Sequence, residues 1–131
     1  MSLEVHVVTP EREVWAGSAE MLIARGVDGE LGILGGHAPM MVQLAVGPLR
    51  IQPAGEDGEI RAVVDGGFLH VTSEGGETRA DILATGAVLA GEIDVEAARR
   101  RLEELGRASD TEDEAVKTEI AKAEARISLA G

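Results

Sequence analysis

The chain has 131 residues, with 24 acidic and 12 basic side chains, a net charge of −12 and no cysteine. This length suits one domain, or one small domain with an appendage. A chain without cysteine has no disulfide scaffold, thiolate metal site or cysteine nucleophile. The acidic balance argues against nucleic acid and anionic lipid as partners, because both would be repelled, and it favours basic partners.

Short apolar segments with alternating residues predict strands through the first 91 residues. They lie at 3–7, 13–15, 21–23, 49–51, 60–64, 68–71 and 81–83. Turn signals separate them at 28–29, 35–36, 57–58, 66–67 and 75–76. Asp57-Gly58, between two apolar runs, is the clearest hairpin signal. Many short strands at this spacing favour an antiparallel sandwich or barrel.

The uncharged stretch from Leu31 to Leu49 has the length of a membrane span, but it contains six glycines and prolines. Such residues would leave backbone groups unpaired in lipid. We therefore expect turns and short buried strands there, and no direct membrane insertion. Residues 1–16 lack a basic start and a long apolar run, so we expect no secretory signal and a reducing cytoplasm.

The composition changes near Gly91. Fifteen of the 17 glycines and all four prolines precede residue 92, and helix interiors exclude both residue types. This predicts a β domain at 1–91 and two helices within 92–131, paired antiparallel across a short connection.

Three residues mark the expected helix ends. Asp94 is placed to cap the first helix, and Gly106 to end it in the left-handed conformation. Thr111 forms a capping-box pattern with Glu114 at the start of the second helix. The apolar stripes of both helices are thin, so the hairpin needs the β domain or a partner to hold it.

No catalytic constellation is present, and the histidines His6, His37 and His70 have no metal-ligand spacing. We expect no metal site. His37 differs from the other two because it follows two glycines in an uncharged loop, where a polar residue is a candidate contact.

Three consecutive arginines, Arg99 to Arg101, stand out in an acidic chain. They have two interpretations. They form a solvated helix face through i,i+4 pairs (Glu96 with Arg100, Arg99 with Glu103, Arg100 with Glu104). Alternatively they dock against an acidic surface or a phosphate, in a surface extended by Lys117, Lys122 and Arg126.

Two motifs together resemble those of the epsilon subunit of F-type ATP synthases. GELGILGGHAPM at 29–40 is similar to that family's G-E-[LM]-G-[IV]-x-P-G-H-[AI]-P-[LM] loop, with Gly35 in place of the usual proline. DGGFLHV at 65–71 is similar to its second signature, and residues 3–17 resemble its usual start. The resemblance covers essentially the whole chain in order.

The resemblance implies a mainly β protein with an α tail: an N-terminal antiparallel β-sandwich of about ten strands and a C-terminal two-helix hairpin. It implies a non-catalytic rotor subunit of the central stalk, in which the sandwich binds the gamma subunit and the ring of c subunits. It also implies a peripheral protein at the cytoplasmic face of a bacterial membrane. The implied contacts with the c ring are Glu30, Leu31, Gly32, Leu34 and His37.

In this family the tail can extend into the catalytic head and inhibit ATP hydrolysis. The implied contacts with the acidic segments of the alpha and beta subunits are Arg99, Arg100, Arg101, Lys122 and Arg126. Such charge pairs would be sensitive to salt.

Some members bind ATP in the folded tail through an [IL]-D-x-x-R-A motif. This chain has IDVEAA at 93–98, so Ala97 replaces the arginine that would pair with phosphate. The candidate nucleotide contacts are Ile93, Asp94 and Arg126, and Arg99 or Arg126 would have to replace the missing group. We expect no tightly bound cofactor.

The residues alone leave two other functions open. One is a β-sandwich binding module that dimerises through its helices, and the other is a small nucleotide sensor with its site in the tail. An enzyme is the least favoured class, because nucleophile–base pairs are few.

Overall fold

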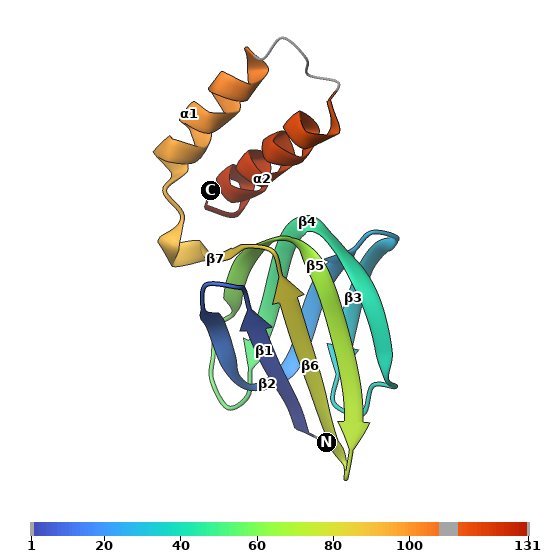
Figure 1. The fold of residues 1–131 in the computed structure, drawn as a ribbon. Helices are drawn as coiled ribbons and strands as arrows, with labels where there is room; N and C mark the ends of the chain where they lie inside the picture. Colours follow the sequence, from blue (N-terminus) through green and yellow to red (C-terminus); the bar gives the residue numbers. More distant parts are fainter. Residues whose placement is uncertain (1, 108–112, 131) are drawn as a thin grey trace.

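The computed structural model describes residues 2–107 and 113–130 (Figure 1). Within these ranges there are seven strands: β1 (Ser2–Val8), β2 (Glu13–Gly26), β3 (Gly29–Leu34), β4 (Met40–Pro53), β5 (Ile60–Glu74), β6 (Glu77–Ala84) and β7 (Ala87–Leu89). A short 3-10 helix, η1 (Ala90–Glu92), leads to α1 (Val95–Gly106) and α2 (Glu114–Ala130). The predicted order of a β domain and then a helical hairpin is confirmed. The implied count of ten strands is wrong, since the described residues form seven.

The sheet closes on itself. Its order is β1-β6-β5-β4-β2, and β1 also pairs with β2, so five strands form a barrel-like sandwich. β3 pairs with β2, and β7 pairs with β5. Among the pairings of the described residues, β1 with β6 is parallel, which corrects the expectation of a wholly antiparallel sheet. Closure gives each of the five strands a neighbour on both sides, and among the described strands β3 and β7 keep a free edge.

Three long strands explain the lower strand count. β2, β4 and β5 have 14, 14 and 15 residues, and β2 and β5 change pairing partners along their length. β2 pairs first with β1 and then with β3 and β4. β5 pairs with β7 at residues 62–64 and with β6 at 67–74. A strand that passes from one face of a sandwich to the other reads as two strands in a sequence pattern.

The bend of β5 lies at Gly66 and Gly67, which have φ angles of 92° and 133°. A Cβ on Gly67 would lie 2.1 Å from the carbonyl oxygen of Leu83, so only glycine fits there. The turn predicted at 66–67 is therefore wrong, because this glycine pair bends one strand instead of separating two. The turns predicted at 57–58 and 75–76 are confirmed, since they connect β4 to β5 and β5 to β6.

The core lies inside the sandwich. Inward-facing residues alternate along the strands, as Leu3, Val5 and Val7 do on β1, and these three side chains are almost fully buried. The main buried cluster runs from Leu3 to Ala87 and takes none of the described residues of α1 or α2. The helices therefore attach to a β domain that has its own core.

The cap predicted at the start of α1 is confirmed. The Asp94 carboxylate accepts a hydrogen bond from the Ala97 backbone N–H at 3.0 Å. The left-handed stop predicted at Gly106 is wrong, because Gly106 is the last helical residue and the following Arg107 is right-handed. The Arg107 N–H bonds the Glu104 carbonyl at 3.2 Å, a tightened last turn that satisfies the helix end.

The start of α2 is capped by Asp113. Its carboxylate accepts the N–H of Ala115 at 2.8 Å, and its carbonyl accepts the N–H of Lys117 at 2.9 Å. The capping box predicted with Thr111 lies outside the described residues. Asp113 is an N-terminal cap of α2, because its carboxylate accepts a hydrogen bond from an N–H group that has no partner within the helix.

The two helices lie side by side beyond one end of the sandwich and run in opposite directions, while the N-terminus lies at the other end (Figure 1). α2 contacts α1, β4, β5 and η1. The domain boundary predicted after residue 91 falls within η1.

Candidate functional site

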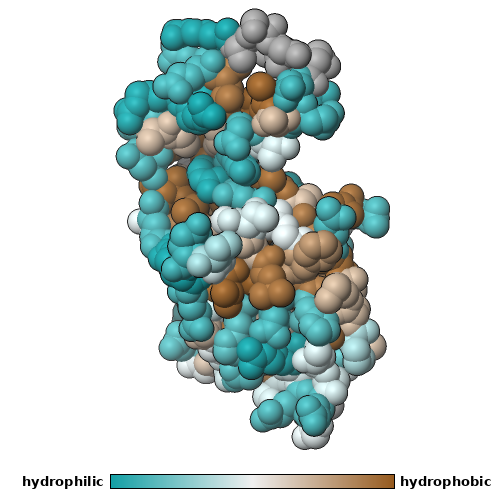
Figure 2. All heavy atoms as spheres, viewed as in Figure 1, coloured by the Kyte–Doolittle hydropathy of each residue, from teal (hydrophilic) through white to brown (hydrophobic). Residues whose placement is uncertain are grey.

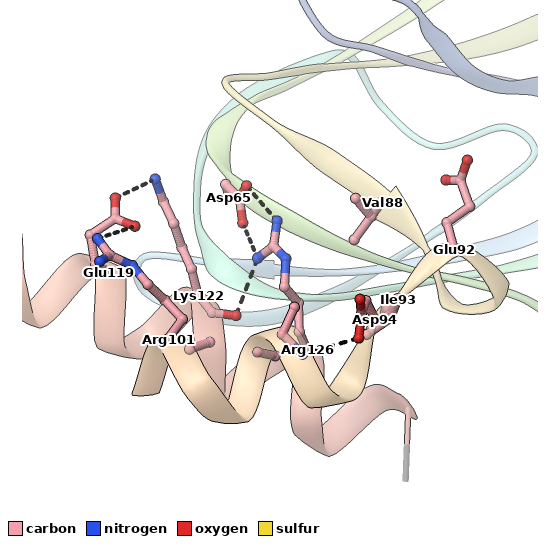
Figure 3. Close-up of a pocket in the computed structure, with 12 residues that line it drawn as sticks. Asp65, Val88, Glu92, Ile93, Asp94, Arg101, Glu119, Lys122 and Arg126 are labelled. Atoms are coloured by element: carbon pink, nitrogen blue, oxygen red, sulfur yellow. Dashed lines mark hydrogen bonds and ion pairs between the residues drawn. The ribbon is translucent and has the colours of Figure 1, made fainter. Parts of the chain in front are cut away.

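A cleft of about 420 Å³, here called the tail cleft, lies where the helices meet the sandwich (Figure 3). Its walls come from the bend of β5, the segment between β7 and α1, and the facing sides of α1 and α2. Its charged lining residues are Asp65, Glu92, Asp94, Arg101, Glu119, Lys122 and Arg126. It is therefore a site in which charged side chains from both domains meet beside apolar ones.

Asp65 is held in place by its surroundings on the sandwich. Its N–H donates to the carbonyl of Gly86 at 2.8 Å, and the Thr85 hydroxyl donates to the Asp65 carbonyl at 2.9 Å. A Cβ on Gly86 would lie 2.7 Å from a carboxylate oxygen of Asp65. Gly86 thus leaves the space that the Asp65 side chain occupies, just before the bend at Gly66.

Arg126 of α2 forms a bidentate ion pair with Asp65. Its two terminal nitrogens each lie 2.8 Å from one carboxylate oxygen, and it also donates to the Lys122 carbonyl at 3.1 Å. The side chains of Arg126 and Asp65 are only 22% and 11% exposed. Paired N–H···O bonds of this kind fix geometry as well as charge, and partial burial protects them from screening by salt.

The other two cations of the tail cleft share one carboxylate. Lys122 lies 3.1 Å from Glu119, and Arg101 of α1 lies 4.0 Å from the same side chain. Figure 3 shows these pairs on one side of the cleft and the Asp65–Arg126 pair beside them. All three cations therefore already have acidic partners.

Glu92 fastens η1 to the loop between β1 and β2. Arg12 donates two hydrogen bonds to its carboxylate at 2.6 and 2.8 Å, and the Leu89 N–H donates a third at 2.9 Å. These bonds lower the pKa of Glu92 from 4.5 to about 2, with the Arg12 hydrogen bond as the largest cause. In Figure 3, Glu92 points away from the cations of the tail cleft.

The candidate nucleotide contacts come together in the structure. Ile93, Asp94 and Arg126 all line the tail cleft, and so does Ala97, at the position of the missing motif arginine. Arg99, considered as its replacement, does not line the cleft; Arg101 does. Nucleotide binding stays a prediction, and Arg126 would have to share its guanidinium between Asp65 and a phosphate.

The candidate contacts with the catalytic head divide into two groups. Arg99 and Arg100 are exposed on α1, whereas Arg101, Lys122 and Arg126 line the tail cleft.

The three predicted i,i+4 pairs are not formed: Arg99 pairs with Glu96 at 3.1 Å, and Arg101 lies 3.6 Å from Glu104. Arg100 has no ion pair with any residue in the described ranges.

The candidate c-ring contacts do not form a single loop. Residues 30–34 belong to strand β3, which pairs with β2, so the expected loop is limited to 35–39. Glu30, Gly32 and Leu34 are exposed, whereas Leu31 packs against the core. At about 3.3 Å per residue, Glu30 and Leu34 are roughly 13 Å apart along the strand, and His37 lies beyond Leu34.

His37 sits in a loop that is attached to β6. The backbone N–H of Gly36 donates to the buried Thr78 hydroxyl at 2.7 Å, and the His37 N–H donates to the Leu34 carbonyl at 3.1 Å. β6 begins just before Thr78, beside the N-terminal end of the sandwich in Figure 1. The His37 loop therefore lies at the end of the β domain opposite the helices.

An exposed apolar patch was missed by the sequence analysis. Phe68 on β5 and Leu83 on β6 are cross-strand neighbours and are 47% and 53% exposed. With Val8 and Pro10 they border a shallow depression of about 350 Å³, and we call these four residues the sandwich patch. Figure 2 shows apolar side chains gathered on this face. The available signal was the alternation at 81–84, which leaves Leu83 facing outward.

No group of histidine, aspartate or glutamate residues in the described ranges is arranged to hold a metal ion. Among the same residues, no helix is long and apolar enough to cross a bilayer.

Comparison with known proteins decides the family. Residues 2–90 match the family model described as ATP synthase, Delta/Epsilon chain, beta-sandwich domain. The ATP synthase epsilon chain of Thermobifida fusca is 46% identical over 129 residues, covering 98% of this chain and 91% of that one. The chain belongs to the ATP synthase epsilon chain family. The epsilon chain of Brevibacillus brevis is 47% identical over 104 residues, or 77% of this chain and 75% of that one.

Solved structures agree with this family. A chain in the cryo-EM structure of the Euglena gracilis mitochondrial ATP synthase, OSCP/F1/c-ring in rotational state 1, has a TM-score of 0.74 and 31% identity, covering 93% of this chain and 76% of that chain. A chain from the Tetrahymena thermophila mitochondrial ATP synthase central stalk/c-ring has a TM-score of 0.60 over 99% and 94%; at 18% identity it supports the fold alone. Epsilon chains are non-catalytic subunits of ATP synthase, and the two structural neighbours come from structures described as OSCP/F1/c-ring and central stalk/c-ring.

Proposed function

We propose that this chain is a rotor subunit that connects the gamma subunit to the proton-driven c ring during ATP synthesis, with a helical tail that restrains ATP hydrolysis. Membership of the epsilon chain family supports the proposal that this chain assembles into an ATP synthase. It would act as a peripheral protein on the cytoplasmic face of a bacterial membrane, since the curated relatives quoted above are bacterial.

The sandwich patch is the observation that best supports binding to gamma. Phe68 and Leu83 are large apolar side chains left exposed side by side on a strongly acidic protein. Exposed apolar patches rimmed by polar residues mark protein–protein contacts, and aromatic residues are enriched among the energetic centres of such contacts. We assign the sandwich patch to the gamma interface.

The loop at 35–39 and the exposed end of β3 would face the c ring. This assignment places the ring at the end of the sandwich opposite the helices, because His37 lies there. Leu34, which is exposed, would contribute apolar contact, and the His37 side chain a polar one. Glu30 lies at the other end of β3, which leaves His37 and Leu34 as the main contacts.

Contact of the tail with the alpha and beta subunits requires α2 to leave the sandwich. Lys122 and Arg126 face the tail cleft in this structure and are already paired. Arg99 and Arg100 are already exposed in this structure. We therefore propose that this arrangement is the non-inhibiting one and that an extended tail presents the full set of cations.

The gamma interface is tested by measuring binding of purified gamma to the full chain and to single variants. Phe68→Asp and Leu83→Asp place a charge in the sandwich patch and should weaken binding at least about tenfold, since a buried unpaired charge is costly. Val27→Asp is the matched control, because Val27 is also apolar and exposed but lies in the turn between β2 and β3. Equal affinities for all three variants would contradict the proposed interface.

ATP binding in the tail cleft is a second candidate, supported by the convergence of Ile93, Asp94 and three cations there. ATP should then raise the unfolding temperature of the full chain. Arg101→Gln should remove this effect, whereas Arg100→Gln, which changes an exposed arginine outside the tail cleft, should not. An unfolding temperature that ATP leaves unchanged would exclude this candidate.

A further inference from the structure

The helical tail is attached to the sandwich with little apolar contact. Among its described residues, only Ala98 and Leu105 of α1 and Ala123 of α2 are buried hydrophobic side chains. Two of these are alanines, which bury little area, and ordering two helices costs conformational entropy at every residue. The position of the hairpin therefore depends on specific contacts more than on a shared core.

One such contact dominates. Within residues 2–107 and 113–130, the Asp65–Arg126 pair is the one ion pair and the one hydrogen-bonded side-chain contact between an α-helix and the sandwich. Among the same residues, the other ion pairs of α1 and α2 are local to a helix, as Arg99 with Glu96 is, or join α1 to α2, as Arg101 with Glu119 does. Breaking them would not release the hairpin from the β domain. The Arg12–Glu92 pair fastens η1, which precedes α1, and involves neither α-helix.

The sandwich side of this contact is held by residues of the sandwich itself. The backbone of Asp65 is fixed by hydrogen bonds to Gly86 and Thr85, and the missing side chain of Gly86 makes room for the carboxylate. A carboxylate held in a fixed position loses little entropy when a planar guanidinium docks on it. The sandwich thus holds the Asp65 carboxylate in a position where one arginine can bind both of its oxygens.

We propose that Asp65 and Arg126 form a latch that holds the helical hairpin on the sandwich, and that Gly86 positions the Asp65 carboxylate for it. Opening the latch releases α2 and frees the Arg126 guanidinium. The latch deepens the proposed function, and its regulatory meaning rests on that function: its strength sets the fraction of chains whose tail is free to inhibit hydrolysis.

The latch is tested on the full chain alone, without gamma or the catalytic head. The chain has no cysteine, so Ser73→Cys on β5 and Thr118→Cys on α2 give two spin-label sites, both exposed. Pulsed electron paramagnetic resonance then measures the ratio of released to docked hairpins. In this labelled background we compare Asp65→Asn, Arg126→Gln and the variant carrying both substitutions.

Each single substitution should raise the ratio of released to docked hairpins about tenfold, the range expected for losing hydrogen bonds to charged groups. The double variant should match the single variants, because both substitutions remove the same interaction. Gly86→Ala should shift the ratio in the same direction through displacement of Asp65. Asp81→Asn is the matched control: it removes a carboxylate that pairs with Arg79 within β6, and it should leave the ratio unchanged.

Two results would overturn the latch. One is a ratio in the Asp65 and Arg126 variants equal to that of the Asp81 control, which would assign the docking to apolar packing. The other is additive effects in the double variant, which would show that the two residues act separately. Arg126→Gln lies outside the sandwich core, so it keeps the test valid if the Asp65 variant does not fold. If the variants change the ratio as stated but the full chain does not inhibit ATP hydrolysis, the proposed function is refuted and the latch is not.

Discussion

Replacing Gly67 by alanine should destabilise the whole β domain. Its φ angle of 133° is a conformation that side chains rarely adopt, which costs about 1–3 kcal/mol. The added Cβ would also lie 2.1 Å from the Leu83 carbonyl oxygen and 2.8 Å from the Ala84 Cα, and overpacking against backbone costs about 1–3 kcal/mol more. The sum, about 2–6 kcal/mol, is a large part of the stability of a small domain.

Thermal unfolding followed by circular dichroism measures this change. At about 4–8 °C per kcal/mol for a domain of 60–100 residues, Gly67→Ala should lower Tm by about 10 °C or more. Gly32→Ala is the matched control: Gly32 also lies in a strand, its φ is not positive, and no atom lies within 4 Å of its added Cβ. A Tm for Gly67→Ala close to that of Gly32→Ala would refute the view that this bend closes the sandwich.

Three further substitutions test other contacts. The depressed pKa of Glu92 means that its bonds to Arg12 stabilise the fold above about pH 4.5 and are lost as the pH falls towards 2. Glu92→Gln should therefore reduce the dependence of the unfolding temperature on pH in this range. A pH dependence equal to that of the unchanged chain would contradict this role of Glu92. Thr78→Val removes the partner of the Gly36 N–H and should lower the free energy of unfolding, measured in urea, by about 1–3 kcal/mol. It should also speed amide hydrogen exchange at Gly36. Slow exchange at Gly36 in this variant would count against the hydrogen bond. Asp94→Ala removes the cap of α1 and should cost about 1 kcal/mol, seen as faster amide exchange in the first turn of α1; unchanged exchange would exclude the cap.

Much of the fold was predictable, because the signals are local. The change of composition near Gly91 predicted the order of β domain and helices, and Asp57-Gly58 predicted a hairpin. The carboxylate of Asp94 predicted a cap that the structure contains. Each of these depends on a few neighbouring residues and not on distant contacts.

The strand count and the parallel pairing were not predictable from the residues. Gly66 and Gly67 look the same in sequence whether they turn the chain between two strands or bend one strand. The difference depends on β6 lying close enough to exclude a side chain, as the contact with Leu83 shows. The pairing of β1 with β6 joins segments about 75 residues apart, and no local pattern encodes it.

The candidate site was only partly predictable, because some of its contacts also join residues that are distant in the sequence. Ile93, Asp94 and Arg126 were named from a motif and do meet in the tail cleft. Asp65 was not named, because its partner Arg126 is 61 residues away and nothing around Asp65 signals a contact with a helix. Arg99 was named with Arg126 as a replacement for the missing arginine, but Arg101 lines the cleft instead, because the rotation of a helix relative to the sandwich is fixed only by tertiary packing.

The most direct test of the proposed rotor function is ATP hydrolysis by a purified alpha–beta–gamma head, measured without the chain, with the full chain, and with residues 1–91. The main core cluster lies within residues 3–87, so the truncated chain keeps it. Both forms should co-elute with gamma, and only the full chain should slow hydrolysis. If neither form binds gamma and the full chain forms a homodimer through its helices, the rotor function is contradicted and a binding module takes its place.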